Sequence, residues 1–271
     1  MSTEASAPVE VRTERLRVGE GEIRLLRAGS GPPLLFLHAA GGGGWTPFLD
    51  GLSRSFDVLA PDHPGFDESE QTEEMEGIDD LVLHYLRLLD LLEIDRAIVV
   101  GASLGGWLAA ELAVHSPERV EKLVLLSPAG LRIPEAPPAD LFAVPGERFA
   151  AKLFHDPAIA ASLFGGEPSV DDIIRMYHNS TAFARYAWRP FLNNPKLERR
   201  LYRVTAPTLV LWPDDDQVIP RAHAERYAER IADARLQLVE GCGHAMYMEK
   251  PEEFTSAVLA FVSAGQNGGT R

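Results

Sequence analysis

Length, composition and charge already limit what this chain does. It has 271 residues and a formal net charge of −14, from 26 Lys and Arg against 40 Asp and Glu. This acidity excludes nucleic acid as a partner, because phosphate binding needs basic clusters, and it disfavours anionic membranes. One cysteine, Cys242, excludes an internal disulfide and favours a reducing compartment. The first ten residues lack the basic and apolar regions of a secretory signal, so we expect a soluble, cytoplasmic protein.

Residues 9–130 are predicted to form the first part of an α/β core domain. Residues 9–18 and 22–28 alternate apolar and polar side chains, which predicts an antiparallel hairpin at one edge of a sheet. Helices are expected over residues 81–92, which carry one apolar stripe, and over residues 103–115. The remaining apolar runs are continuous, as in parallel strands buried on both faces; they lie at residues 34–37, 57–60, 97–100 and 123–126.

Residues 131–203 interrupt this alternation. The segment begins with a proline-rich stretch and continues with helical patterns at 148–154 and 170–177, and it has no strand-like run. An insertion of this length between two buried strands is too long for an ordinary connection. We therefore predict a helical cap inserted into the sheet domain.

The α/β pattern resumes in residues 204–264, the second part of the core domain. Apolar runs at 208–212 and 236–239 predict two more buried strands, and helices are expected over 221–231 and 251–262. The predicted fold is an α/β fold with a mostly parallel eight-stranded sheet, flanking helices and the inserted cap. The ends of the chain, residues 1–8 and 265–271, are expected to be flexible tails.

The sharpest chemical motif is Gly101-Ala102-Ser103-Leu104-Gly105, which follows an apolar run and begins a helical pattern. A turn this tight strains the serine backbone and leaves no room for side chains beside it, which explains the flanking glycines. The hydroxyl is then expected at the C-terminal edge of the sheet, where open α/β folds bind ligands. The alternative is that Ser103 merely caps the helix.

A serine nucleophile needs a base and an acid that orients the base. His244 lies on a glycine-rich loop after the last apolar run, which also opens at the C-terminal edge. The consecutive Asp214, Asp215 and Asp216 follow the preceding apolar run. All three leave a strand at the correct end, and three aspartates in a row also suit a solvated turn, so the residues alone do not choose the acid.

Taken together, these motifs resemble the α/β-hydrolase superfamily, and the resemblance covers nearly the whole chain. The order Ser103, Asp216, His244 is that family's order of nucleophile, acid and base. Asp216 fits the family's G-x-x-D-x-x-x-P turn, with Pro213 in place of the glycine and Pro220 at the end. The resemblance therefore implies that Asp216 is the acid.

Two further stretches are similar to the family, with one departure. Residues 243–251 look like the family's G-H-x-x-x-x-E-x-P sequence, and residues 62–69 look like D-x-x-G-x-G-x-S. In the second of these, Asp67 replaces a glycine. We expect this change to alter the shape of a loop near the site.

The resemblance also implies two backbone N–H donors for the oxyanion that forms in acyl transfer. One is the N–H of Leu104. The other, by position, is the N–H of Ala40, in a loop where Ala39 replaces the usual glycine and His38 is expected to hold the chain in place. The alternative for the glycine run 41–44 is a flexible loop without a ligand. The run lacks the Lys-Ser/Thr sequence that would follow in a phosphate-binding loop.

No metal ion and no cofactor are predicted, because the sequence has no cysteine cluster, no H-E-x-x-H and no aspartate ladder of EF-hand spacing. We assign substrate selection to the cap, which is rich in aromatic residues, and to apolar side chains near the serine. The side chains expected to contact the substrate are Trp45, Trp107, Phe142, Trp188 and Met246.

The first expectation for function is a serine hydrolase, a carboxylesterase that cleaves a small, fairly apolar ester through an acyl-enzyme. The second is hydrolysis of a carbon–carbon bond in a vinylogous diketone, because the layout and cap length are similar to the meta-cleavage-product hydrolases. Those enzymes usually carry tryptophan after the histidine, where this chain has Ala245. A cofactor-free haloperoxidase or perhydrolase would use the same triad, and a non-catalytic binder would leave it unused. The expected partner is a small-molecule substrate, and a homodimer is compatible with the sequence.

Overall fold

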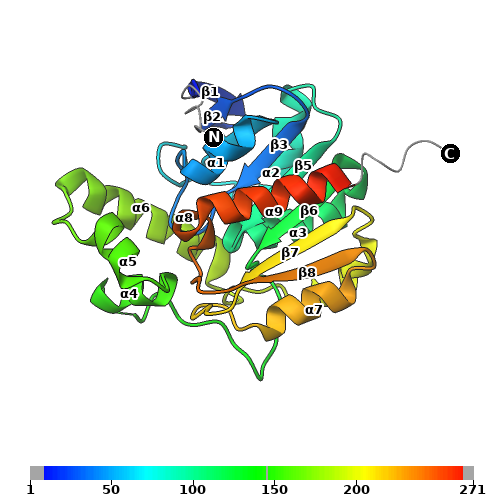
Figure 1. The fold of residues 1–271 in the computed structure, drawn as a ribbon. Helices are drawn as coiled ribbons and strands as arrows, with labels where there is room; N and C mark the ends of the chain where they lie inside the picture. Colours follow the sequence, from blue (N-terminus) through cyan, green and yellow to red (C-terminus); the bar gives the residue numbers. More distant parts are fainter. Residues whose placement is uncertain (1–8, 145, 265–271) are drawn as a thin grey trace, which may run out of the picture.

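The computed structural model describes residues 9–144 and 146–264, so both predicted tails lie outside the described residues. At its centre is one eight-stranded sheet with the strand order β1-β2-β4-β3-β5-β6-β7-β8 (Figure 1). This confirms the predicted mostly parallel sheet. The strands are β1 (Arg12–Val18), β2 (Gly21–Ala28), β3 (Pro33–Leu37), β4 (Asp57–Pro61), β5 (Ala97–Ala102), β6 (Val120–Leu126), β7 (Thr208–Pro213) and β8 (Ala234–Val239).

The N-terminal hairpin lies at one edge of the sheet, as predicted. β1 pairs with β2, and β2 with β4, in antiparallel fashion, whereas the strands from β4 to β8 pair in parallel. Parallel neighbours need crossover connections, and helices supply them. The helices around the sheet are α1 (Pro47–Ser53), α2 (Ile78–Leu91), α3 (Leu104–His115), α7 (Ala222–Arg230), α8 (Met246–Glu249) and α9 (Pro251–Ala264), with short 3₁₀ turns at Pro117–Arg119 and Glu198–Arg203.

Two hydrophobic cores form on opposite faces of the sheet. One packs α2, α3 and α7 against the strands, and the other packs α1 and α9. Successive side chains of a strand point to opposite faces, so Ala97 and Val99 of β5 enter the first core while Ile98 and Val100 enter the second. All four are at most 1% exposed, which explains why this strand is continuously apolar.

The prediction of burial on both faces is wrong for residues 236–239. They belong to β8, the last strand of the sheet, whose only strand neighbour is β7. An edge strand has fewer neighbours to cover it, and Leu238 is 37% exposed.

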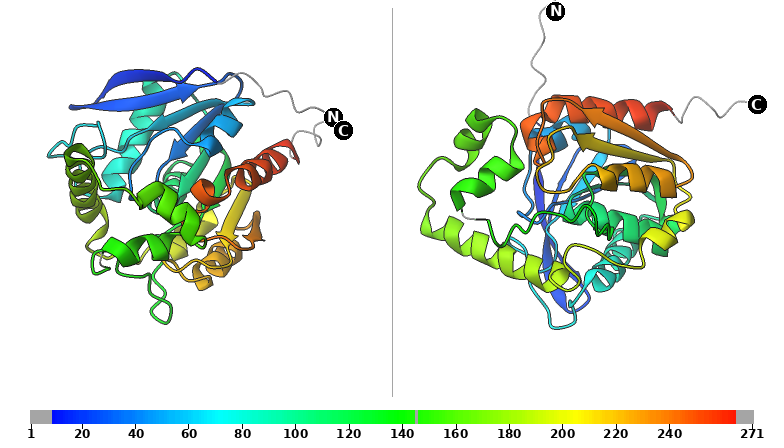
Figure 2. Two further views of the ribbon diagram at one scale, coloured as in Figure 1. Left: turned by 60° about the vertical axis from the view of Figure 1, so that its left-hand side comes forward. Right: turned by 90° about the horizontal axis from the view of Figure 1, so that it is seen from below.

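Three helices stand together beyond the C-terminal edge of the sheet (Figures 1 and 2). They are α4 (Gly146–Leu153), α5 (Pro157–Phe164) and α6 (Val170–Ala187), and they lie in the chain between β6 and β7. α6 begins with a capping box, because the Ser169 hydroxyl accepts from the amide of Asp172 while the Asp172 carboxylate accepts from the amide of Ser169. None of the helices in the described residues is long and apolar enough to cross a membrane.

The strand order contains a point at which the chain reverses its progress through the sheet. β3 lies between β4 and β5, so the chain leaves β3 through α1 on one face and returns to β5 through α2 on the other. Ligands of open α/β sheets bind at such a point of reversal. The loops after β3, β5, β7 and β8 all open toward it, and they carry the residues that the sequence analysis singled out.

Candidate active site

Ser103 lies in the turn between β5 and α3, with φ of 53° and ψ of −110°. This left-handed conformation costs a non-glycine residue about 1–3 kcal/mol and persists only where the surroundings impose it. The surroundings are very close here: a Cβ atom on Gly101 would lie 2.2 Å from the Gly105 carbonyl oxygen, and a Cβ on Gly105 would lie 2.1 Å from the carbonyl oxygen of Leu37. The Ser103 side chain makes no capping hydrogen bond to α3, so the helix-cap alternative is not what the structure has.

Three segments bring their side chains together at this turn. His244, in the loop after β8, has its Nε2 atom 2.9 Å from the Oγ of Ser103. Its Nδ1 atom is 2.8 Å from Oδ2 of Asp216, in the loop after β7. The side chains of His244 and Asp216 are only 6% and 2% exposed. The residues predicted as nucleophile, base and acid therefore form one continuous hydrogen-bonded chain.

The aspartate fixes the tautomer of the histidine. A carboxylate accepts the proton of Nδ1, which leaves Nε2 free to accept the hydroxyl proton of Ser103. The other carboxylate oxygen of Asp216 accepts hydrogen bonds from the backbone amides of Val218 and Ile219, each at 2.8 Å. Burial alone raises the pKa of Asp216, but attraction to His244 and these hydrogen bonds outweigh it and hold the pKa below its usual value. Asp216 is thus a carboxylate that stabilises a positive charge on His244.

The neighbouring aspartates have other partners. Asp214 accepts a hydrogen bond from the amide of Cys242 at 3.3 Å. Asp215 turns toward α4 and α5 and pairs with Nδ1 of His155 at 2.8 Å. Geometry therefore selects Asp216 from the three, a choice that the residues alone left open.

Of the two expected oxyanion donors, Leu104 directly follows the serine, and Ala40 lines the same cavity as Ser103. Leu104 is the first residue of α3, and Ala40 belongs to the loop after β3. Within the described residues, neither N–H donates to another backbone or side-chain group. Free amides beside a nucleophile are the arrangement that stabilises a developing oxyanion.

A buried histidine pair holds the loop that carries Ala40. Nε2 of His38 accepts a hydrogen bond from the backbone amide of His63 at 2.9 Å. The Nδ1 atom of His38 therefore carries the proton and donates to the Ala39 carbonyl at 2.7 Å. Nε2 of His63 donates in turn to the His38 carbonyl at 3.0 Å, and its Nδ1 accepts from the hydroxyl of Tyr85. Burial lowers the pKa of both imidazoles, which favours their neutral forms. His38 holds the loop and takes no proton in the relay.

An apolar cavity of about 300 Å³ opens over Ser103 and His244. Its walls come from the loop after β3, from the segment after His244 and from the helices α4 to α6. Among the described residues that line it there is no lysine and no arginine. The lining residues are Ala39, Ala40, Gly41, Gly42, Gly43, Thr46, Ala102, Ser103, Leu141, Phe142, Phe149, Leu153, Phe154, Phe164, Met176, Asn179, Ser180, Phe183, His244, Ala245, Tyr247 and Met248.

Of the five residues expected to contact the substrate, only Phe142 lines this cavity. Trp107 is 3% exposed and directs its Nε1–H to Glu111, and Met246 is 1% exposed in the core beside α9. Trp188 is 49% exposed and packs edge-on against Phe142, and Trp45 packs against the core from its half-buried place before α1. The expectation for these four residues is corrected: Trp107 and Met246 are core residues, Trp188 packs against Phe142 from outside the cavity, and Trp45 packs against the core beside α1.

The main polar residue that the sequence analysis missed is Asn179. It lies in the middle of α6 and is 4% exposed, and it lines the cavity together with Met176 and Phe183. Those two residues are three positions before and four positions after it, so all three share one helical face. Aromatic content identified the wall, but the polar residue on the same face was the signal for a specific contact.

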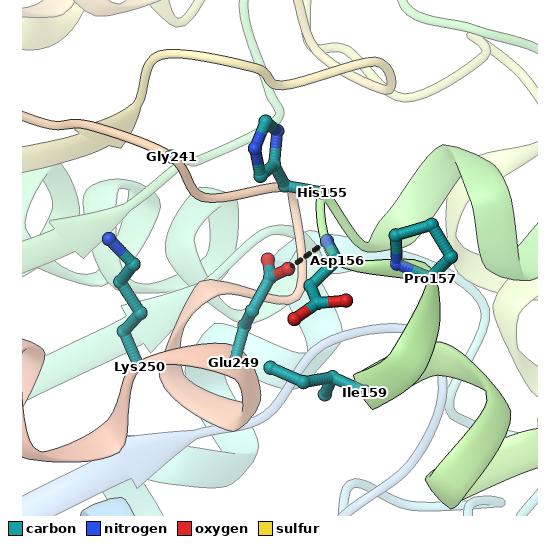
Figure 3. A pocket seen from close by; sticks show the side chains of 7 residues that line it. All are labelled: His155, Asp156, Pro157, Ile159, Gly241, Glu249 and Lys250. Atoms are coloured by element: carbon teal, nitrogen blue, oxygen red, sulfur yellow. Dashed lines mark hydrogen bonds between the residues drawn. The ribbon is translucent and has the colours of Figure 1, made fainter.

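A second set of contacts ties α4 and α5 to the loop that carries His244 (Figure 3). Glu249 accepts from the amide of Asp156 at 2.6 Å and from the amide of Gly243 at 2.7 Å. The amide of Ala245 donates to the carbonyl of Leu153 at 2.8 Å. These bonds fix the loop on both sides of His244. The same region holds a second cavity of about 340 Å³, lined by His155, Asp156, Pro157, Ile159, Gly241, Glu249 and Lys250.

Potential metal ligands and the lone thiol lie apart from the triad. Among the described residues, one group of side chains has its ligand atoms close enough to hold an ion, namely Asp79, Glu111 and His115 of α2 and α3. Cys242 is fully buried in the core, and burial raises the pKa of its thiol. A protonated, buried thiol is a poor nucleophile.

The fold and this arrangement define an α/β hydrolase. A sequence model described as the alpha/beta hydrolase family matches residues 34–257, and the chain belongs to that family, as the sequence motifs indicated. The structure also resembles the 2-hydroxy-6-oxo-6-phenylhexa-2,4-dienoate hydrolase of Rhodococcus sp. strain RHA1. The two share 24% of residues, with a TM-score of 0.76 over 94% of this chain and 99% of that one.

Relatives of similar length include enzymes named for carbon–carbon hydrolysis substrates. The 2-hydroxy-6-oxo-6-phenylhexa-2,4-dienoate hydrolase of Comamonas testosteroni is 30% identical over 268 residues, which cover 90% of this chain and 88% of that one. The 2-hydroxymuconate semialdehyde hydrolase of Pseudomonas sp. (strain CF600) is 32% identical over 252 residues, which cover 87% and 88%. The chain is therefore similar to both along most of its length.

Proposed function

We propose that this α/β hydrolase cleaves the bond beside a carbonyl carbon in a small, largely apolar substrate, with Ser103 as nucleophile, His244 as base and Asp216 as orienting acid. The observation that carries the proposal is the hydrogen-bonded chain from Ser103 Oγ through His244 to Asp216, which ends at an apolar cavity. A hydroxyl, a base and an acid in this order support acyl transfer.

The reaction follows from the direction of the hydrogen bonds. Ser103 Oγ attacks the carbonyl carbon while its proton moves to Nε2 of His244, and the carboxylate of Asp216 stabilises the resulting imidazolium. The amides of Ala40 and Leu104 stabilise the oxyanion. His244 then donates its proton to the leaving group, and an acyl-enzyme is left on Ser103. Water activated by His244 hydrolyses it and releases a carboxylic acid.

For the bond that is cleaved, the named activities of the relatives favour a carbon–carbon bond over an ester. Both relatives are named for 6-carbonyl dienoate-type substrates, in which the carbon that leaves can hold negative charge as part of a conjugated system. In such a reaction His244 would deliver its proton to carbon. We therefore take a vinylogous ketone as the first substrate class to test.

Ester hydrolysis is the second candidate, and one feature of the cavity favours it. The dienoate substrates named for these relatives carry a carboxylate, whereas the described lining of this cavity has no cationic side chain. Burying an unpaired carboxylate among aromatic rings is costly. A neutral ester with an apolar acyl group meets no such penalty.

The deciding experiment is a substrate panel with active-site counting. p-Nitrophenyl esters of increasing acyl length would be assayed beside two vinylogous diketones, one with and one without a carboxylate, and a fluorophosphonate would count reactive serines. We expect labelling at Ser103 and turnover of the uncharged substrates ahead of the anionic one. Folded protein without labelling would contradict the proposal and favour a binder, and turnover only with added peroxide would favour a perhydrolase.

A further inference from the structure

The glycine run of the loop after β3, residues 41–44, is held mainly by side-chain hydrogen bonds. A Cβ atom on Gly41 or Gly44 would meet nothing within 4 Å, so packing does not fix these residues. Asp67, which stands where the family pattern has glycine, accepts the amide of Gly43 on Oδ2 at 2.5 Å. Asp67 itself has φ of 48°, a left-handed conformation that is uncommon outside glycine, although aspartate adopts it more readily than most residues.

The cap holds both partners of that bond from the other side. Nδ2 of Asn179, on α6, donates to the Gly41 carbonyl at 3.0 Å and to Oδ1 of Asp67 at 3.1 Å. Oδ1 of Asn179 accepts the amide of Asp67 at 2.8 Å. The amide group of one buried cap residue thus joins the loop after β3 to the loop after β4, with both of its N–H groups and its carbonyl oxygen engaged.

We propose that Asp67 and Asn179 form a clamp that positions the amide of Ala40, so that the cap sets the geometry of the oxyanion site. This inference rests on the proposed function. The buried pair of His38 and His63 holds the loop before Ala40 by hydrogen bonds. The clamp holds Gly41 and Gly43, which follow Ala40. Asp67 and Asn179 are positioning residues, because they act through the loop.

The clamp also couples the bound substrate to the oxyanion donor, because one clamp residue lines the cavity. Asn179 shares its helical face with Met176 and Phe183, and all three line the cavity. A substrate that packs against this face of α6 presses on the residue that holds the Gly41 carbonyl. Displacement of a catalytic group by about 1 Å can cost about 100-fold in rate. We therefore expect the clamp to affect how kcat depends on substrate length more than it affects substrate binding.

The test replaces the clamp residues one at a time and together. In Asp67→Asn, the new side-chain NH₂ group replaces one of the two accepting oxygens. It then points either at the backbone N–H of Gly43 or at the side-chain NH₂ of Asn179, so one hydrogen bond is lost in either orientation. We expect kcat to fall about 10- to 100-fold while KM changes less than about threefold. Asp67→Gly restores the family residue, relieves the backbone strain and should show the same loss in kcat.

The pH profile separates positioning from simple support. In Asn179→Asp, two carboxylates face each other and one faces the Gly41 carbonyl. The ratio of its kcat to that of the wild type should therefore be lowest at neutral pH and rise in acid, where the two carboxylates share a proton. The double variant Asp67→Asn/Asn179→Asp restores the bond between positions 67 and 179, and its kcat should exceed that of Asn179→Asp at pH 7. The other titratable groups near Asp67 are Arg24, Asp62 and His38, which stay unchanged in every variant.

Asp171→Asn is the matched control, because Asp171 is exposed on the first turn of α6. Fluorophosphonate stoichiometry and Tm would report the folded fraction of each variant. The clamp is overturned if Asp67→Asn and Asn179→Asp keep wild-type kcat, if their losses match a loss of folded protein, or if KM rises and kcat does not fall. Wild-type protein that is never labelled at Ser103 overturns the proposed function and this inference together, whereas labelled wild type with unaffected variants overturns the clamp alone.

Discussion

The nucleophile turn and the loop after β3 face each other across the same site, yet they are held in different ways. Around Ser103, backbone lies so close that a Cβ on Gly101 or Gly105 would lie within 2.2 Å of a carbonyl oxygen. Around Gly41 and Gly44 there is open space, and hydrogen bonds from other parts of the chain hold the loop. One half of the site is fixed by packing, and the other half is fixed by polar contacts that a substitution or a substrate can change.

This difference assigns two roles to glycine in one site. At the turn, glycine is required because nothing larger fits. At Gly41 and Gly44, in the loop, a Cβ would meet nothing within 4 Å, so hydrogen bonds rather than packing place the backbone there. The turn therefore fixes the Ser103 hydroxyl by packing, whereas hydrogen bonds fix the glycine run at Gly41 and Gly43.

The largest effect is expected from Ser103→Ala, which removes the reacting atom and keeps the turn. We expect kcat to fall by on the order of 10³–10⁶, with the oxyanion site providing the residual rate. Tm should stay close to that of the wild type. Ser162→Ala on the exposed surface of α5 is the matched control and should keep full activity. Retained activity in Ser103→Ala would show that the turn holds no nucleophile.

Asp216→Asn extends the comparison to the loop after β7. The new amide still accepts from Val218 and Ile219, but it no longer fixes the proton on Nδ1 of His244, so kcat should fall about 10³- to 10⁴-fold. Asp214→Asn and Asp215→Asn should lose less than about tenfold. Steady-state rates of the three purified variants give the order, and equal rates would mean that the acid has been misassigned.

Gly105→Ala against Gly41→Ala tests the comparison directly. The first change places a methyl group 2.1 Å from the Leu37 carbonyl oxygen, and we expect a loss of about 3 kcal/mol or more in the free energy of unfolding. The second meets nothing and should stay within about 0.5 kcal/mol. Urea unfolding of both variants measures the difference, and similar losses would refute the division into a packed half and an open half.

The smallest effect is expected from His155→Ala, which removes the contact between the α4–α5 segment and Asp215 in the loop after β7. The hydrogen bond that His155 donates to Asp215 raises the pKa of His155, and the same bond lowers the pKa of Asp215. Because the pKa of His155 is raised in the folded protein, the contact stabilises the fold fully at pH values below 6.5, the ordinary pKa of histidine. This stabilisation is lost as the pH rises through the pKa of His155 in the folded protein. The lowered aspartate pKa stabilises above its usual 3.8 and loses this effect in acid.

The pair therefore contributes between about pH 4 and pH 6.5. Both side chains are largely exposed, so the Tm of His155→Ala should fall by only about 1 °C near pH 5.5 and less at pH 9. Thermal melts of the two proteins at both pH values make the comparison. A larger loss at high pH would show that the contact does not depend on charge.

The sequence predicts the features that depend on neighbouring residues. The nucleophile turn is recognisable because strain and close packing demand glycine two positions before and after the serine, and the order of the segments supplies base and acid. The wall of the cavity is less accessible to sequence reasoning. α3 is buried all round, so periodicity gives no hint that Trp107 faces the core and not the substrate. The clamp needs contacts between residues 67 and 179, which no local pattern encodes.

The distance along the chain between the members of the relay has a consequence for biosynthesis. Ser103 and His244 are 141 positions apart, and His244 enters through the strand at the far edge of the sheet. A nascent polypeptide whose N-terminal strands have already assembled on the ribosome still has a serine without its base. Hydrolytic activity should therefore appear only after β8 has docked and brought His244 to the serine.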